Sequence, residues 1–361
     1  GEPGQREFLN TYGVPMASNR PLVCAVVITY DGRRFLEGCL RTLLATDYDN
    51  LRVLLVINGS SDGSEDFVRQ TFPEVELLVL PSNIGCLPAC NQGLATALER
   101  GAEHVVLCND DIEVLDQRWL SESTAIMQNN PTMGIVGYLE DTGHDAVLPD
   151  VVKAQPVKHV AFFAALMRGE MLRQLGLFDL EFTMYAAEDD LILRSNRAGY
   201  GTAQLNVPFL HFGGGTITRS DPRTGYMQMH SALHLCIKHH GPLRLAAKVM
   251  RIMDVACNPW PLSMDRNDHA HVRMRNRGNV FLNGWLILQA LGRNIWQLRR
   301  TLKRGRVDLE KARQARRRLN RATPRLPITG MTHSVESSKS SPPVRARDER
   351  EIVDIQQPSI S

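Results

Sequence analysis

Four continuous apolar runs mark the first third of the chain, over residues 22–28, 51–57, 76–80 and 104–108. A run that is apolar on both faces is typical of a strand buried in a parallel sheet. Between the runs, apolar side chains recur at helical spacing. The helices that this spacing predicts cover residues 35–44, 65–71 and 87–100. Strands that alternate with helices in this way predict βαβ units and an α/β domain with a mainly parallel sheet.

Beyond residue 110 the pattern is less regular. It predicts a helix over residues 119–128, strands over 134–137 and 160–167, and a loop over 138–157. A helix then ends at Ala198, and a strand or loop covers residues 199–208. From residue 225 the chain reads as helical, with breaks at Gly241-Pro242 and 259–261. After Pro327 its Ser, Pro and Arg content predicts disorder.

These patterns divide the chain into four parts. We expect an irregular lead-in over residues 1–20, an α/β domain over 21–220, a helical and basic extension over 221–326, and a disordered tail over 327–361. The polar turns that follow the four strands contain Gly, Asn or Asp. Because ligands of open α/β sheets bind beyond the carboxyl ends of the strands, these turns predict a binding rim.

The net charge of +3 is unevenly distributed along the 361 residues. Between Arg293 and Arg325 there are 13 Lys and Arg against 2 Asp and Glu, whereas residues 1–292 carry a net charge of about −7. A mildly acidic body therefore carries a basic C-terminal arm. Its residues 286–306 mix Leu, Ile and Trp with Arg and Lys, which suits an anionic membrane surface. A helix packed on the core with solvated arginines explains the pattern equally well, and no motif indicates nucleic-acid binding.

The seven cysteines show neither a disulfide framework nor zinc-ligand spacing, so we expect reduced thiols in a cytoplasmic protein. The first residues do not read as a signal peptide. The most apolar C-terminal run, residues 280–291, is shorter than the roughly 20 residues of a spanning helix. The predicted location is the cytoplasm, with peripheral contact to the inner membrane face as a further expectation.

Two clusters of acids are candidate sites. Asp110 and Asp111 follow the fourth strand directly, where oxygen ligands suit Mg²⁺ or Mn²⁺ and a helix N-cap is the alternative. Glu188, Asp189 and Asp190 precede a helix, where they could bind a cation, remove a proton or favour the helix start. The first strand is not followed by Gly-x-Gly-x-x-Gly, and the chain has no P-loop motif, which argues against dinucleotide binding and P-loop chemistry.

Six segments, taken in chain order, resemble the motifs of family 2 glycosyltransferases, nearest to the rhamnosyltransferase-like branch. They cover residues 28–31, 58–64, 83–93, 109–111, 176–194 and 211–216. Each segment is short, and their common order and spacing carry the resemblance. It implies a GT-A fold, a nucleotide-sugar donor, a divalent metal ion, Mg²⁺ or Mn²⁺, and inversion at the anomeric carbon. The acceptor would be a hydroxyl of a glycan, a polysaccharide or a lipid-linked saccharide.

The resemblance also implies roles for particular residues. Contacts to the nucleotide sugar fall on Thr29, Tyr30, Asp31, Asn58, Asn83, Gly85, Asn91 and Asp110. Metal contacts fall on Asp111, Asn109 and His211. The general base falls on Glu188, or on Asp189 if the register slips by one residue. For His211, a histidine bonded inside a turn is an equal alternative.

Three positions depart from the family pattern. Ile57 replaces an Asp that reads the nucleobase, Asn109 replaces the first Asp of the metal motif, and Ala187 stands where the family has Glu. These departures leave two alternatives to an active transferase. One is a nucleotide-sugar-binding protein with impaired catalysis, and the other is an interaction protein with a basic arm.

Overall fold

The computed structural model describes residues 20–143, 146–183, 185–213, 222–240, 244–250 and 280–322. Several predictions concern residues outside these ranges. They are the lead-in before Arg20, the end of the last motif at 214–216, the breaks at 241–242 and 259–261, and the tail from residue 327.

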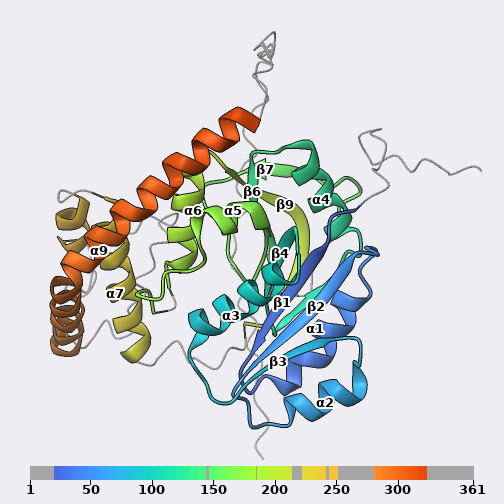
Figure 1. The fold of residues 1–361 in the computed structure, drawn as a ribbon. Coiled ribbons are helices and arrows are strands. Elements are labelled where there is room, and N and C mark those ends of the chain that lie inside the picture. Colours follow the sequence, from blue (N-terminus) through green and yellow to red (C-terminus); the bar gives the residue numbers. More distant parts are fainter. Residues whose placement is uncertain are drawn as a thin grey trace, which may run out of the picture. The chain divides into compact units, whose positions relative to one another are not determined.

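The N-terminal half of the sheet is parallel, as predicted, with strand order β3-β2-β1-β4. Its strands are β1 (Val23–Thr29), β2 (Leu51–Asn58), β3 (Glu76–Leu80) and β4 (His104–Asn109). The helices between them are α1 (Arg33–Leu44), α2 (Ser64–Thr71) and α3 (Cys86–Glu99). Since the strands run in one direction, the turns that leave them share one edge of the sheet, and Figure 1 shows this half in blue to teal.

The C-terminal half makes the sheet mixed rather than mainly parallel. It contains β5 (Ile112–Val114), β6 (Met133–Asp141), β7 (Ala154–Pro156), β8 (Ala164–Arg168) and β9 (Gly201–His211). Strand β8 is antiparallel to both β4 and β6, whereas β6 and β9 are parallel. The strand predicted over 160–167 begins only at Ala164, and the loop predicted over 138–157 starts inside β6 and contains β7. A register shift between Gly137 and Leu139 explains the first part of that error, because it interrupts the alternation of side chains.

Side chains of β1 alternate between two apolar clusters. Val23, Ala25 and Val27 belong to the cluster that includes α1 and α4 (Trp119–Asn129). Cys24 and Val26 belong to the cluster that includes α3, α5 (Gly169–Leu175) and α6 (Ala187–Ala198). The continuous apolar runs therefore arise because both faces of the sheet are covered.

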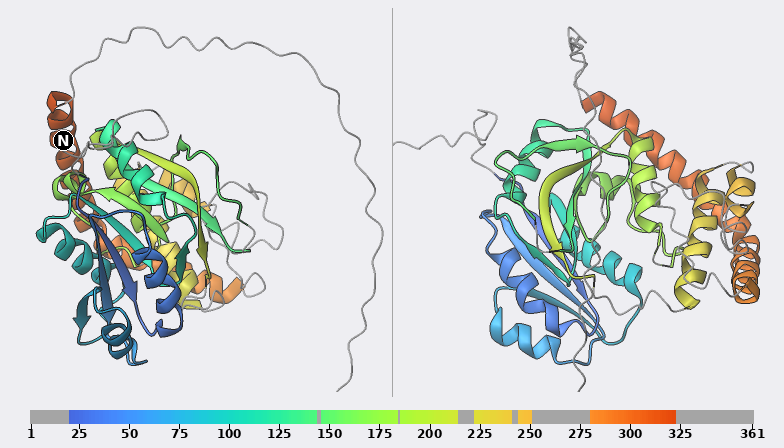
Figure 2. Two further views of the ribbon diagram at one scale, coloured as in Figure 1. Left: turned by 90° about the vertical axis from the view of Figure 1, so that its right-hand side faces the viewer. Right: turned by 180° about the vertical axis from the view of Figure 1, so that it is seen from behind.

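Two further helices follow the sheet: α7 (Pro222–His239) and α9 (Val280–Ala322), with a short helical segment over residues 244–250 between them. Helix α9 packs against α5, α6 and α7 (Figures 1 and 2). Its buried side chains recur every three or four residues at Ile287, Ala290, Asn294, Gln297 and Thr301, and again at Ala312 and Ala315. No helix among the described residues is both long and apolar enough to cross a membrane.

Candidate donor and metal site

Asp31 connects the turns that leave β1 and β2. Its backbone N–H donates to Ser60 Oγ at 3.1 Å, and its Oδ1 accepts from the Ser61 N–H at 2.8 Å. Asp31 has a φ of 51°, a left-handed conformation that Asp tolerates better than most residues. The neighbouring Tyr30 side chain is exposed at this edge. The two turns thus form one cross-linked rim.

The Asn58 side chain holds the turn that follows β3. Its Nδ2 donates to Asn83 Oδ1 at 3.1 Å and to the Gly85 carbonyl oxygen at 3.3 Å, and its Oδ1 accepts from the Ile84 N–H at 3.0 Å. Asn83 Oδ1 also accepts from the Gly85 N–H. Asn58 is buried, so these bonds shape the loop in front of α3.

Thr29 and Asp110 join the ends of β1 and β4. Thr29 Oγ1 donates to Asp110 Oδ2 at 2.6 Å. Burial and the adjacent Asp111 raise the pKa of the Asp110 carboxyl to about 6, against the lowering effect of the Thr29 hydrogen bond. Gly32 is required beside this pair, because a Cβ there would collide with the Asp110 carboxylate.

His211, at the end of β9, lies between two carboxylates. Its Nδ1 is 2.6 Å from Glu140 Oε1, and its Nε2 is 3.3 Å from Asp111 Oδ1. The Asn109 side-chain amide is 3.4 Å from the same Nε2, and the ring stacks on Phe163. Burial would lower the pKa of His211, but the hydrogen bonds with Asp111 and Glu140 outweigh it and raise that pKa.

This arrangement fits a hard divalent cation whose remaining ligands come from a substrate. Asp111 offers a buried carboxylate, and His211 offers Nε2 while Glu140 holds the opposite nitrogen, as carboxylates often do behind a metal-binding histidine. No group of three or more His, Cys, Asp or Glu in the described ranges is arranged to hold an ion. Such a set still suits Mg²⁺ or Mn²⁺, which are commonly bound through one or two carboxylates plus substrate phosphates.

Glu188 occupies the first turn of α6, beside Ala186, which has a left-handed φ of 60°. Burial raises the pKa of Glu188 to about 7, and the charge of Asp189 acts in the same direction. A carboxylate with this pKa is suited to accept a proton near neutral pH.

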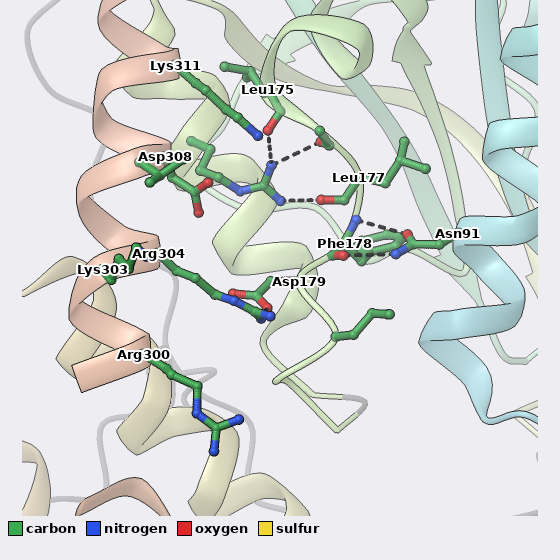
Figure 3. A pocket seen from close by; sticks show the side chains of 14 residues that line it. Asn91, Leu175, Leu177, Phe178, Asp179, Arg300, Lys303, Arg304, Asp308 and Lys311 are labelled. Atoms are coloured by element: carbon green, nitrogen blue, oxygen red, sulfur yellow. Dashed lines mark hydrogen bonds and ion pairs between the residues drawn. The ribbon is translucent and has the colours of Figure 1, made fainter. Parts of the chain in front are cut away.

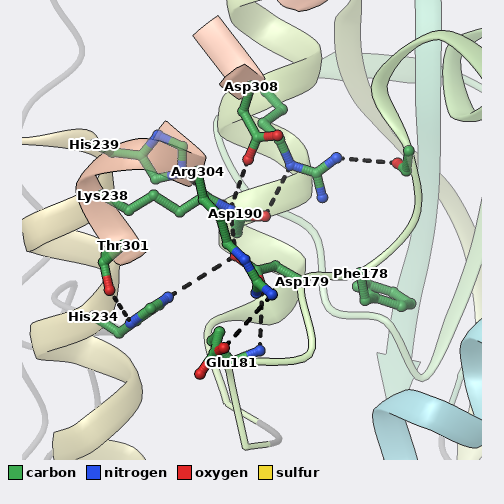
Figure 4. A network of polar contacts seen from close by, with 12 residues as sticks. Phe178, Asp179, Glu181, Asp190, His234, Lys238, His239, Thr301, Arg304 and Asp308 are labelled. Carbon is green, nitrogen blue, oxygen red and sulfur yellow. Dashed lines mark hydrogen bonds and ion pairs between the residues drawn. The ribbon is translucent and has the colours of Figure 1, made fainter. Parts of the chain in front are cut away.

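The two acids after Glu188 already have partners. Asp189 Oδ1 is 2.8 Å from His159 Nδ1, and this hydrogen bond raises the pKa of His159. Asp190 is fully buried, and its carboxylate pairs with Arg194, Lys238 and His239 (Figure 4). The three adjacent acids therefore have three different environments.

Cys86 is an exposed cysteine on which both clusters of acids act. It begins α3, and the charges of both Glu188 and Asp110 act on its thiol. Its Sγ lies 4.0 Å from that of Cys90, and this contact lowers the pKa of Cys86. The base candidate on α6 and the acid after β4 thus both influence the pKa of the same thiol.

Comparison with known proteins assigns the N-terminal part of this site to a family. Residues 24–174 match the profile of glycosyl transferase family 2. These residues form a family 2 glycosyltransferase domain. The match and the mixed sheet with flanking helices confirm the predicted GT-A fold and its helical C-terminal segment. The rhamnosyltransferase-like branch stays a prediction.

Relatives of the glycosyltransferase domain are distant. An uncharacterized protein, y4gI of Sinorhizobium fredii, is 29% identical over 221 residues, which cover 50% of this chain and 23% of that protein. The chain thus spans about a quarter of the length of this curated relative.

Two solved structures resemble the chain, each with a TM-score of 0.48. The mannosyltransferase PcManGT from Pyrobaculum calidifontis, in complex with GDP-Man and Mn²⁺, is 19% identical, and the match covers 83% of this chain and 88% of that one. S. aureus TarS 1–349, in complex with UDP-GlcNAc, is 16% identical, with 82% and 90% covered.

The structure brings most of the predicted site residues of the glycosyltransferase domain to one edge of the sheet, but the Asn91 amide faces elsewhere. Its Nδ2 donates to the Phe178 carbonyl oxygen at 2.9 Å, and its Oδ1 accepts from the Phe178 N–H at 3.0 Å. Asn91 therefore holds the loop before the acidic stretch. Sequence reasoning missed Glu140, His159 and Cys86. Glu140 and His159 lie in or beside the stretch read as a loop, and no motif points to them.

Proposed function

We propose that this protein transfers a sugar from a nucleoside-diphosphate donor to a hydroxyl acceptor, with inversion at the anomeric carbon. One observation carries the proposal: Asp111, in the stretch that matches family 2 glycosyltransferases, lies 3.3 Å from His211 Nε2, and the base candidate Glu188 has a raised pKa near neutrality. A site for a diphosphate and a base for a hydroxyl are the two requirements of this reaction.

Asp111 and His211 would hold Mg²⁺ or Mn²⁺, with the Asn109 amide beside them. When bound, the ion would stabilise the charge that develops on the diphosphate leaving group. Glu140 orients His211 through Nδ1, so that Nε2 points toward Asp111. The rim formed by Asp31 and the turns after β1 and β2 would bind the nucleotide, with Tyr30 exposed there for stacking.

Glu188 would act as the general base. In its ionised form it accepts the proton of the acceptor hydroxyl while the hydroxyl oxygen forms a bond to the anomeric carbon and the bond from that carbon to the diphosphate oxygen breaks. Ala187 is buried in the apolar cluster and has no group that could accept a proton, so we keep Glu188 as the proposed base. Asp189, engaged with His159, is the second choice.

For the acceptor we propose a glycan, polysaccharide or lipid-linked saccharide, reached from the cytoplasmic face of a membrane. The outward face of α9 supports membrane contact, because Trp285, Leu288, Ile295 and Trp296 are exposed there next to arginines. Aromatic and basic side chains on one helix face suit the boundary between headgroups and acyl chains.

The test is release of nucleoside diphosphate from a panel of nucleotide sugars, with Mn²⁺ and with EDTA. We expect turnover of at least one donor with Mn²⁺, its loss with EDTA, and donor binding without turnover in Glu188→Gln. A wild-type chain that binds donors but never turns them over would instead favour a donor-binding protein, given the departures at Ile57 and Asn109. A chain that binds no nucleotide would overturn the proposal.

A further inference from the structure

A cavity of about 570 Å³ lies between α9 and the loop over residues 175–180, outside the candidate donor site (Figure 3). One wall is the backbone that leads from α5 toward the acidic stretch. The other is a face of α9 that presents Arg300, Lys303, Arg304 and Lys311 at intervals of three, one and seven residues. One face of the long basic helix therefore lines the hollow with four cations, each of which stays exposed to solvent.

The carboxylates of this cavity are already neutralised. Asp179 pairs with Arg304 and with Lys238 at 2.7 Å, and Asp308 pairs with the same Lys238 at 2.8 Å (Figure 4). Burial alone would raise the pKa of Asp179, but His234 and Lys238 hold it well below its usual range. Both acids therefore already have cationic partners.

Three cations at the cavity form no ion pair within the described ranges. They are Arg300, Lys303 and Lys311. Lys311 Nζ lies over the backbone of Gly176, 3.7 Å from where a Cβ would stand. The carbonyl oxygens of residues 175–177 each already accept a hydrogen bond from Arg194. The cavity therefore has an excess of positive charge and unused donors.

The same cavity has an apolar side. Phe178 and Leu177 line it from the loop, and the partly exposed Leu180 and Val307 flank it. Arg300 lies over the ring of Trp296 at 4.6 Å, which leaves the edge of its guanidinium free to donate. Trp296 itself is 74% exposed, so the apolar surface continues past the cavity along α9. A ligand that fits has an anionic end and an apolar body.

We propose that this cavity binds a phosphate or diphosphate ester whose organic part is apolar. The phosphate oxygens would accept hydrogen bonds from Lys303, Lys311 and the Arg300 guanidinium. The apolar part would lie against Leu180, Val307 and the Trp296 ring. The site needs no sugar transfer, so it stands or falls separately from the proposed function.

Calorimetric titration of the full chain tests this proposal with two soluble probes, inorganic pyrophosphate and farnesyl diphosphate. We expect farnesyl diphosphate to bind more tightly than pyrophosphate, because only the former fills the apolar side. In Lys303→Ala/Lys311→Ala we expect its affinity to fall about tenfold or more, as two charge-assisted contacts are lost. Leu180→Ser should weaken the binding of farnesyl diphosphate and leave the binding of pyrophosphate unchanged.

The matched control is Arg306→Ala/Arg317→Ala, which removes two exposed charges of α9 that do not line the cavity. The affinity should stay at the wild-type value in this variant. An equal loss in both double variants would overturn the proposal, because net charge alone would then explain binding. The circular dichroism spectrum and thermal midpoint of each variant must match the wild type for the comparison to count.

Sedimentation with vesicles separates a lipid headgroup from a soluble ester as the source of the phosphate. Phosphatidylcholine vesicles with and without phosphatidic acid serve as probes. If Lys303→Ala/Lys311→Ala lowers binding to phosphatidic acid vesicles and Arg306→Ala/Arg317→Ala does not, the cavity binds a phosphate of the bilayer. If neither double variant changes vesicle binding while the affinity for farnesyl diphosphate still falls in Lys303→Ala/Lys311→Ala, the ligand is a soluble ester. No binding of either soluble probe and no dependence on the lysines in vesicles would contradict the site.

Discussion

Glu140 Oε1 lies 2.6 Å from His211 Nδ1, so a carboxylate on β6 fixes the orientation of an imidazole at the end of β9. The opposite ring nitrogen then faces Asp111 at 3.3 Å. A histidine held in this way keeps Nε2 available as a ligand and is more basic than a free imidazole. This relationship makes Glu140, which no motif marks, part of the metal hypothesis.

Glu140→Ala is expected to weaken Mn²⁺ binding in the presence of a nucleoside diphosphate by about 10- to 100-fold. The reason is that the His211 ring loses the partner on Nδ1 and can rotate away from Asp111. Electron paramagnetic resonance of free Mn²⁺ measures the affinity directly. Glu99→Ala, at the exposed end of α3, is the control and should bind Mn²⁺ like the wild type. An unchanged affinity in Glu140→Ala would show that His211 is not a ligand.

Glu188→Gln should reduce the rate of transfer by about 10²–10⁴-fold and leave donor affinity nearly unchanged. The amide keeps the shape of the side chain but cannot accept the proton. Because the pKa of Glu188 is raised to about 7, the wild-type rate should rise with pH up to about 7 and level off above it. Steady-state rates measured between pH 5 and 9 check both points. If Asp189→Asn removes activity while Glu188→Gln does not, the base is Asp189.

The sequence predicted the parallel half of the sheet because β1, β2 and β4 are buried on both faces, so their apolar runs are unbroken. It also indicated that Thr29, Asp31 and Asp110 follow strands at one edge of the sheet, where hydrogen bonds now join neighbouring turns. Short elements escaped prediction. Strand β5 has three residues, which is too few to show a period.

Partners far apart in the sequence could not be predicted. Glu140 and His211 are 71 residues apart, and only the pairing of β6 with β9 brings them together. The side-chain direction of an amide is equally hidden from sequence patterns. Asn58 and Asn91 lie in motifs that resemble donor contacts, yet their amides hold the backbone of neighbouring loops.

The placement of Asn91 leads to a prediction that separates a loop anchor from a donor contact. Asn91→Ala should lower kcat and leave the dissociation constant for the donor nearly unchanged, because it frees the backbone at Phe178 that precedes the base. Loss of two hydrogen bonds to a partly buried backbone should also cost about 1–3 kcal/mol of stability. Urea unfolding and donor titration measure the two effects. A donor affinity that falls in parallel with kcat would assign Asn91 to the donor instead.

The last prediction concerns the fully buried Lys238 side chain, which pairs with Asp179, Asp190 and Asp308 from three separate segments (Figure 4). Lys238→Met should cost about 3–5 kcal/mol in the free energy of unfolding, because removing one partner leaves buried carboxylates short of positive charge. Lys158→Ala, at an exposed lysine, is the control and should change stability little.

The pKa values of Asp179 and Asp190 lie below their usual value of 3.8, since hydrogen bonds and cations outweigh burial. Their contribution to stability is therefore fully present above pH 3.8 and is lost as the pH falls below it. Urea unfolding at pH 7 and at pH 3 should show a smaller difference between the Lys238→Met variant and the wild type at the lower pH. A difference that is the same at both pH values would contradict this assignment of the network.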